Sequence, residues 1–168
     1  MVGYGITAFS MMLMVIFVEA PAFAQNPKDV IMKRHLELPT CERDVAYIEK
    51  EADLGDGYWL YGIACQAAAY NESQVFYVSK PADLATATRV KFRIITEDRI
   101  FGHSEEVWNP GFDPQTQQIS SRNFGRGIGD CGRAGLWRRL GTKYELIQFR
   151  YKSDCDGQDD EWPIIFQK

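Results

Sequence analysis

The sequence predicts an all-β fold: a single antiparallel domain arranged as a meander, a sandwich or blade-like sheets. Short segments rich in Val, Ile and aromatic residues alternate with clusters of Gly, Pro, Asn and Asp, which is typical of such domains. No long window shows the periodicity of an amphipathic helix. The four cysteines form two equally spaced pairs, and each pair brackets two strand-like segments joined by a short turn.

In the amino-terminal half, the clearest signal is the alternation of Arg89–Thr96, which places Val90, Phe92 and Ile94 on one face. Asp53–Gly57 contains two glycines and two aspartates and is predicted to be a turn. Lys80–Thr88 contains Pro81 and is predicted to be a loop or a single helical turn. The strands expected here are Asp44–Glu51, Tyr58–Cys65, Gln74–Ser79, Arg89–Thr96 and His103–Trp108.

In the carboxy-terminal half, a glycine-rich bend separates two groups of strands. Gly125–Gly135 is too rich in glycine to be expected as a strand, and Gly141–Lys143 is predicted to be a tight connection. Pro163 lacks the N–H that a central strand needs, so the last strand is expected at a sheet edge. The strands expected here are Gln117–Phe124, Leu136–Leu140, Tyr144–Tyr151 and Trp162–Phe166.

The amino terminus resembles an export signal. Ile6–Val18 is apolar and is followed by small residues around Ala24, which predicts cleavage before Gln25. A membrane anchor is the alternative, but the apolar run is shorter than the ~20 residues that span a bilayer. We therefore expect no stable membrane anchor and a periplasmic or secreted protein. The predicted organisation is a signal peptide at 1–24, a lead-in segment or short helix at 25–40, and a β domain at 41–168.

The cysteines suit an exported chain, because disulfides persist in oxidising compartments. Equal spacing favours Cys41 with Cys65 and Cys131 with Cys155. The outer ends of an antiparallel hairpin lie side by side, within reach of a disulfide. Two hairpin-bracketing disulfides are therefore expected.

Charge is unevenly distributed along the chain. The formal net charge is −4, which argues against a general nucleic-acid binder. A basic stretch from Ser120 to Lys152 is followed by the acidic run Asp154–Glu161. Either the two neutralise each other across adjacent strands, or the basic stretch forms a face for an acidic partner.

Gly127–Gly132 fits G-x-G-x-x-G, but a strand and not a helix is expected to follow it, so we predict no dinucleotide cofactor. The glycines indicate a tight bend or an anion-binding nest of backbone N–H groups helped by arginines. Arg126, Asp130 and Arg133 are interleaved with them and form the candidate binding surface. Arg126 and Asp130 are expected to be constrained and paired; alternatively, Asp130 accepts hydrogen bonds only from the bend itself.

Two other groups resemble metal or catalytic sites. Asp154–Glu161 resembles a calcium loop in composition, but its glycine comes too early for an EF-hand, so a solvated acidic turn is the preferred interpretation. His103 and Glu105 would share one face of a strand and could serve acid–base chemistry, although a structural or surface histidine is preferred. The tryptophans could line a sugar-binding groove, but we expect them in the core.

Several motifs resemble a bacterial envelope family called domain of unknown function 1176. They are A-A-Y-N-E-S-Q-V-F-Y (68–77), N-P-G-F-D-P-Q-T-Q-Q-I-S-S (109–121), G-R-G-I-G-D-C-G-R-A-G-L-W (125–137), and the closing elements C-D-G (155–157) and W-P (162–163). The resemblance covers roughly Tyr58 to Phe166. It implies export and a disulfide-bearing β domain, and it provides no catalytic residues.

The function expected from these observations is that of a binding module or inhibitor in the cell envelope, with an acidic envelope protein or a glycan as partner. Loops on a rigid, disulfide-linked scaffold suit recognition. The alternatives are a hydrolase-like enzyme that uses His103 and Glu105, and a structural envelope protein without a small ligand. No cofactor is expected.

Overall fold

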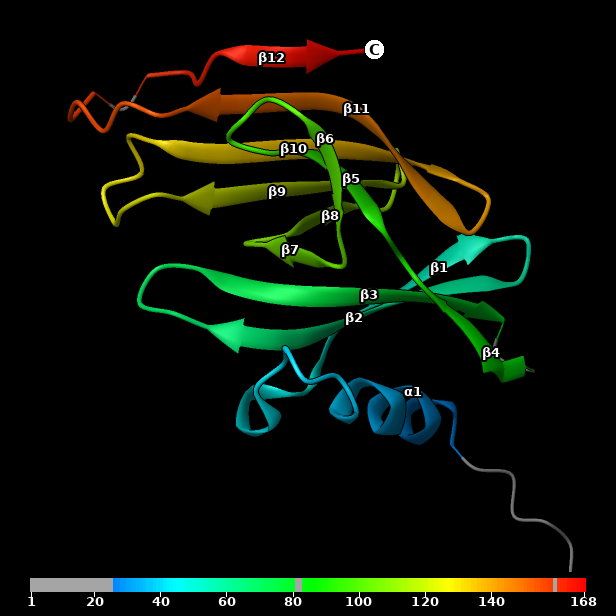
Figure 1. Ribbon diagram of the computed structural model, residues 1–168. Coiled ribbons are helices and arrows are strands. Elements are labelled where there is room, and N and C mark those ends of the chain that lie inside the picture. The colour runs from blue at the N-terminus through cyan, green and yellow to red at the C-terminus, as the bar shows by residue number, and fades with distance from the viewer. Residues whose placement is uncertain (1–25, 81–82, 159) are drawn as a thin grey trace, which may run out of the picture.

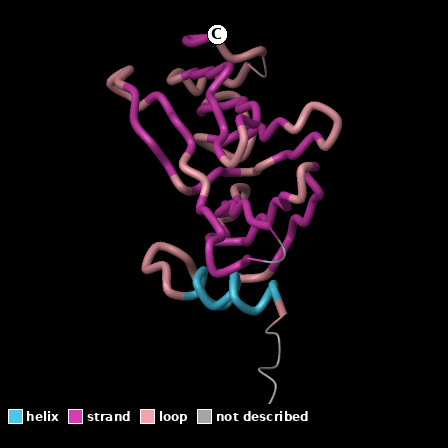
Figure 2. Tube along the Cα trace, turned by 90° about the vertical axis from the view of Figure 1, so that its right-hand side faces the viewer, coloured by secondary structure: helices cyan, strands magenta, loops and turns pink. Residues whose placement is uncertain are grey.

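The computed structural model describes residues 26–80, 83–158 and 160–168 of the chain. Two antiparallel sheets and one helix form three layers, with the helix at one end of the stack and the carboxy terminus at the other (Figures 1 and 2). The predicted all-β antiparallel domain is confirmed. The predicted signal peptide, 1–24, lies outside the described residues.

The first sheet, here called the lower sheet, lies between the helix and the second sheet. It has the order β1–β2–β3–β4, and β7 pairs with β3 beyond the end of β4. Its strands are β1 (Ile48–Gly55), β2 (Tyr58–Ala67), β3 (Glu72–Lys80), β4 (Asp83–Arg89) and β7 (Glu106–Trp108). β3 is buried along nearly its whole length because both faces of this sheet are covered.

The second sheet, the upper sheet, has the order β12–β11–β10–β9–β8. The chain enters it directly from the lower sheet, through the short connection between β7 and β8. Its strands are β8 (Gly111–Asp113), β9 (Gln118–Phe124), β10 (Gly132–Leu140), β11 (Lys143–Lys152) and β12 (Ile164–Gln167). β12 lies at the edge, as Pro163 predicts.

A hairpin of β5 (Phe92–Ile95) and β6 (Phe101–Ser104) runs from the lower sheet to the upper sheet, and Phe92 and Ile95 of β5 enter the core. Phe92 is fully buried, and its ring contacts those of Phe76 in the lower sheet and Trp137 and Tyr144 in the upper sheet. The indole Nε1 of Trp137 donates to the carbonyl oxygen of Arg93 at 2.8 Å. The hairpin is therefore held to both sheets by aromatic packing and by a hydrogen bond.

The lead-in segment forms helix α1 (Pro27–Leu36), followed by a 3-10 turn, η1 (Arg43–Val45). Asn26 caps the helix by accepting a hydrogen bond from the N–H of Lys28 at 3.0 Å. Ile31 and His35, one helical turn apart, are fully buried against the outer face of the lower sheet. The other apolar residues of α1 are only partly buried (Val30 and Met32) or exposed (Leu36), so the periodicity of the helix in the sequence is weak.

The expectation of a loop or helical turn at Lys80–Thr88 is wrong for the part that forms β4. This strand consists largely of alternating Ala and Thr, and Ala87 is buried beneath α1. Small residues let the helix approach the sheet closely, and they give little hydrophobic alternation in the sequence. Residues 81 and 82 lie outside the described part of the chain.

Two segments expected to be single strands are each divided between two elements. Arg89–Thr96 spans the end of β4 and all of β5, because the chain leaves the lower sheet after Val90, whose N–H still bonds to Phe76 O at 2.9 Å. His103–Trp108 spans β6 and β7, which pair with different strands. Alternation persists across the first break, because Val90 and Phe92 on its two sides are both buried.

Several boundaries differ from expectation; the last strand, for example, begins at Ile164 rather than at Trp162. The strand predicted at Asp44–Glu51 begins only at Ile48, because η1 precedes it. The turn predicted at Asp53–Gly57 is shorter than expected, because β1 continues to Gly55. β10 begins at Gly132, inside the bend expected to end at Gly135. The glycine at 135 is tolerated in this strand because the ring of Trp137 covers it.

Both predicted disulfides are present, with S–S distances of 2.07 Å for Cys41–Cys65 and 2.01 Å for Cys131–Cys155. Each brackets a hairpin, β1–β2 or β10–β11. Within the described residues, no helix is long and apolar enough to cross a membrane.

Candidate functional site

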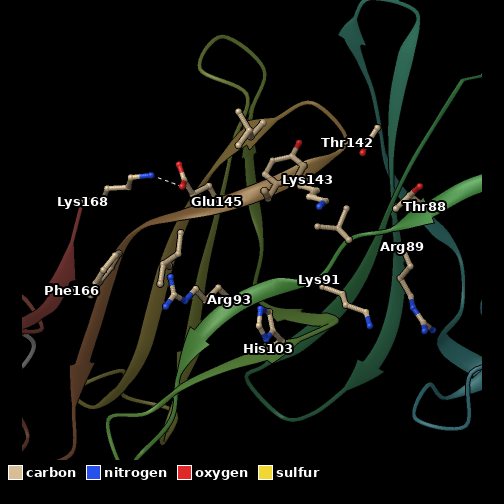
Figure 3. A pocket seen from close by; sticks show the side chains of 14 residues that line it. Thr88, Arg89, Lys91, Arg93, His103, Thr142, Lys143, Glu145, Phe166 and Lys168 are labelled. Atoms are coloured by element: carbon tan, nitrogen blue, oxygen red, sulfur yellow. Dashed lines mark hydrogen bonds and ion pairs between the residues drawn. The ribbon is translucent and has the colours of Figure 1, made fainter.

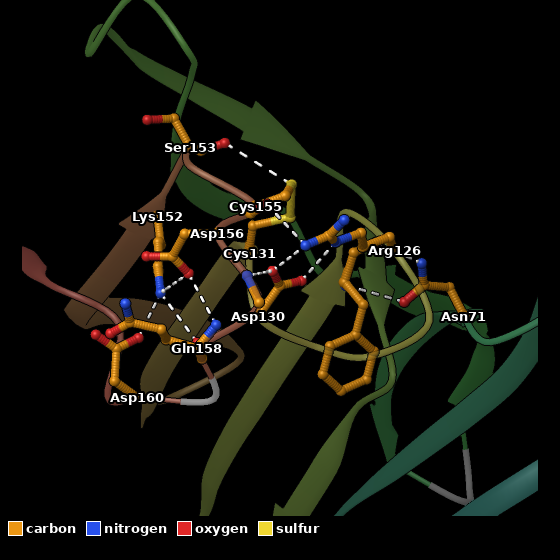
Figure 4. Close-up of a disulfide and its surroundings, with 12 residues drawn as sticks. Asn71, Arg126, Asp130, Cys131, Lys152, Ser153, Cys155, Asp156, Gln158 and Asp160 are labelled. Atoms are coloured by element: carbon orange, nitrogen blue, oxygen red, sulfur yellow. Dashed lines mark hydrogen bonds and ion pairs between the residues drawn. A yellow bond between two sulfur atoms is a disulfide. The ribbon is translucent and has the colours of Figure 1, made fainter.

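The glycine-rich bend between β9 and β10 is organised around the buried carboxylate of Asp130 (Figure 4). Arg126 donates to it from Nε at 2.8 Å and also from Nη2, and the N–H of Gly157 donates at 2.6 Å. A further bond joins Arg126 Nη2 to Cys155 O at 2.7 Å. The hydrogen bond from Arg126, followed by that from Gly157, holds the pKa of Asp130 well below its usual range. The predicted pairing of Arg126 with Asp130 is confirmed.

Arg133, the third residue of the predicted binding surface, projects to a different partner. Its guanidinium pairs with Glu97 and lies over the ring of Tyr151, 5.7 Å from the centroid. Both arginines near the bend therefore already have anionic partners, which leaves little free positive charge for the predicted anion nest. That this bend forms a binding surface stays a prediction.

The acidic run after β11 wraps around the ammonium group of Lys152, which is buried (Figure 4). Lys152 Nζ donates to Asp156 Oδ1 at 2.9 Å, to Gln158 O at 3.0 Å and to Asp160 Oδ1 at 2.5 Å. Its ion pairs with these carboxylates raise the pKa of Lys152. Glu161 pairs with Arg150 at 2.7 Å. Much of the predicted neutralisation between the basic and acidic runs is thus present, and a lysine occupies the centre of the candidate calcium loop.

A groove of about 980 Å³ lies toward the opposite end of the β10–β11 hairpin, between the β4–β5–β6 segment and β10–β12 (Figure 3). One wall carries Arg89, Lys91, Arg93 and His103, and the other carries Lys143, Glu145, Phe166 and Lys168. The wall between them is formed in part by Val90, Tyr144 and Leu146. Its volume is in the range of pockets that hold small organic ligands.

Positive charge dominates this groove. Arg89 pairs with Glu105 at 3.0 Å, Lys91 lies 3.8 Å from the same carboxylate, and Lys168 pairs with Glu145. Arg93 and Lys143 have no carboxylate partner among the described residues. The guanidinium of Arg93 instead lies on the ring of Phe101, 3.7 Å from its centroid. Two unpaired cations therefore remain to attract an anion.

The alternative acid–base pair of His103 and Glu105 does not form, and His103 is exposed, in agreement with the preferred interpretation of a structural or surface histidine. β6 ends at Ser104, whose hydroxyl bonds to both the N–H and the carbonyl oxygen of Glu106, and the chain turns there. Glu105 consequently turns to Arg89, while His103 lies directly across the hairpin from Arg93 and lines the groove. The shared-face expectation is wrong because the strand ends between the two residues.

The tryptophans do not form a common groove. Trp137 and Trp162 are almost completely buried, as the core interpretation predicts, whereas Trp59 and Trp108 are half-buried in the lower sheet. The guanidinium of Arg122 lies 4.6 Å from the Trp162 ring centroid.

Sequence reasoning missed the cationic groove, because its walls come from segments about 50 residues apart in the chain. The alternating V-K-F-R-I run was the one available signal. Its alternation places Lys91 and Arg93 on the face opposite Val90, Phe92 and Ile94, and both of these cations line the groove.

These features define a class of protein: a two-disulfide antiparallel β domain with a helix on one outer face. The chain belongs to the family described as protein of unknown function (DUF1176), whose profile matches residues 18–167. The match begins well before Tyr58, where the motif resemblance starts. A relative, "Uncharacterized protein YpfG" of Escherichia coli strain K12, is 26% identical over 115 residues. That alignment covers 67% of this chain and 33% of the relative, so the chain spans about a third of that protein's length. No solved structure matches the chain.

Proposed function

We propose that this chain is a non-catalytic binding module of the cell envelope, and that its binding site for an anionic ligand is the groove between β4–β6 and β10–β12. The observation that carries the proposal is the pair of unpaired cations, Arg93 and Lys143, on opposite walls of one groove. Positively charged groups that converge on a concave surface raise the local concentration of anions and speed their binding.

The scaffold supports a preformed site. The sheets are tied together at one end by Asn71 and Asn109, whose side chains bond to each other at 2.7 Å, and Asn109 also bonds to Arg122 O at 2.8 Å. Near the other end Gln117 Nε2 donates to Leu54 O at 2.8 Å. A groove with fixed walls loses little entropy when a ligand binds.

The hydrolase alternative is not favoured. Its proposed base, His103, makes no hydrogen bond to a carboxylate within the described part of the chain, and Glu105 is held by Arg89. General acid–base catalysis needs such groups positioned together at the reacting atoms. An envelope location is part of the proposal, supported by the two disulfides, which persist in oxidising compartments.

Backbone amide NMR titrations with inorganic phosphate at low salt test the site. We expect shifts at 89–93, 103 and 143–146, reduced at least about tenfold in apparent affinity by Arg93→Gln, because that variant removes an unpaired charge. Arg138→Gln is the matched control, since Arg138 is exposed on the outer face of β10, outside the residues that line the groove. Shifts confined to 125–133 would assign binding to the glycine-rich bend instead.

A further inference from the structure

We infer that the ligand of this groove is a single-chain anionic amphiphile, with one acid group between the unpaired cations and an apolar chain along the wall. The inference rests on the proposed anion-binding function and specifies the ligand's class. It follows from how polar and apolar groups are divided along the groove.

The wall that a ligand would contact is largely apolar. Phe166 of β12 contributes partly exposed apolar surface to it, whereas Val90 and Leu146 are each only 2% exposed and form its buried backing. At the β10–β11 turn Leu140 also lines the groove, and it is 66% exposed. Exposed leucine at the mouth of a charged groove is apolar surface that an acyl or alkyl chain would remove from water.

The charged part of the groove is small and localised. Arg93 and Lys143 are its cations without carboxylate partners among the described residues, and His103 lies beside Arg93 across the β5–β6 hairpin. One phosphate or carboxylate group would be matched by two cations. A polyacidic peptide would bring more negative charge than these cations match, and its backbone polar groups would meet an apolar wall without hydrogen-bond partners.

An unused hydroxyl group lies in the same wall. Tyr144 is 4% exposed, and its hydroxyl has no hydrogen-bond partner within the described residues. Leaving a buried hydroxyl unpaired costs free energy, which an acid oxygen that reached this hydroxyl would recover.

Octyl phosphate, used below its micellar concentration, is the probe, with inorganic phosphate and octanol as its charged and apolar halves. We expect octyl phosphate to bind the full chain at least about tenfold more tightly than phosphate, because burying methylene groups strengthens binding. Octanol should bind far more weakly than octyl phosphate. Octanoate distinguishes a requirement for phosphate from a requirement for any acid group. If octanoate and octyl phosphate bind equally well, the site accepts any acid group; if only one of them binds, the site requires the headgroup of that compound.

Two surface variants distinguish the contribution of the apolar part of the groove from that of its charged part. Leu140→Ser should weaken octyl phosphate more than inorganic phosphate, whereas Ile128→Ser, at an equally exposed isoleucine on the glycine-rich bend, should change neither. Phosphate and octyl phosphate binding equally well at the groove would overturn the amphiphile and leave the proposed function standing. If neither shifts the groove amides, both fail. Association with phosphatidylglycerol vesicles without binding of dissolved octyl phosphate would also overturn the inference, in favour of a membrane surface.

Discussion

At the scale of single residues, the fold depends on positions where backbone and side chain compete for the same space. Trp137 is the central example. Its ring packs on Phe92, donates to Arg93 O, and lies directly over the backbone of Gly135. A Cβ added at Gly135 would lie 2.6 Å from Cζ2 and 2.7 Å from Cζ3 of the indole. This glycine is needed for space rather than for an unusual backbone angle.

Gly135→Ala should therefore destabilise the protein by about 1–3 kcal/mol, because the indole must move out of a packed core. The measurement is the free energy of unfolding in urea. Gly102→Ala is the matched control, since a Cβ there would only touch Thr96 Cγ2 at 3.4 Å. Equal losses for the two variants would contradict the proposed role of Trp137.

At the scale of elements, the acidic turn after β11 resembles a calcium loop in composition, but a lysine side chain occupies it. Its composition suggests calcium, but the ammonium of Lys152 lies among Asp156, Gln158 and Asp160. The positive charge that such a turn attracts is supplied by the chain itself. The neighbouring disulfide, Cys131–Cys155, and the Asp130–Gly157 bond fix the start of the same turn.

We expect millimolar calcium to leave the melting temperature of the wild-type protein unchanged, because a lysine already occupies the site. Lys152→Met should lower the melting temperature by several degrees, since it leaves Asp156 and Asp160 without their shared cation. Lys33→Met, at an exposed lysine on α1, is the control. A calcium-dependent rise in the wild type would contradict this interpretation.

At the scale of the whole molecule, α1 is held to the sheets through His35. This side chain is fully buried, its Nε2 lies 2.9 Å from Ala64 O, and its ring meets Tyr77 edge-on. Burial lowers the pKa of His35, the nearby charge of Arg89 lowers it further, and the hydrogen bond to Ala64 opposes both. The folded layer therefore favours the neutral imidazole.

Stability should consequently fall as the pH drops below about 6.5, the ordinary histidine value, because the unfolded chain then binds a proton that the folded chain resists. The loss should continue until the pH passes the lowered pKa of the folded state. Urea unfolding at pH 7.5 and 5.5 measures it. His35→Leu should reduce this difference, whereas His103→Gln, at an exposed histidine, should retain it. An unchanged pH dependence in His35→Leu would show that other groups cause it.

The sequence by itself indicated the all-β class, both disulfides and the edge position of the last strand, whereas it left the pairing of Arg126 with Asp130 as one of two alternatives. These features depend on local signals: alternation, turn residues, cysteine spacing and the missing N–H of proline. Only the tertiary structure decided where the chain changes sheets, at Val90 and Glu105, because alternation continues through the first break and no turn signal of Gly or Pro marks the second. It also decided the cationic groove, since no local pattern shows that Arg93 and Lys143, 50 residues apart in the chain, line the same cavity.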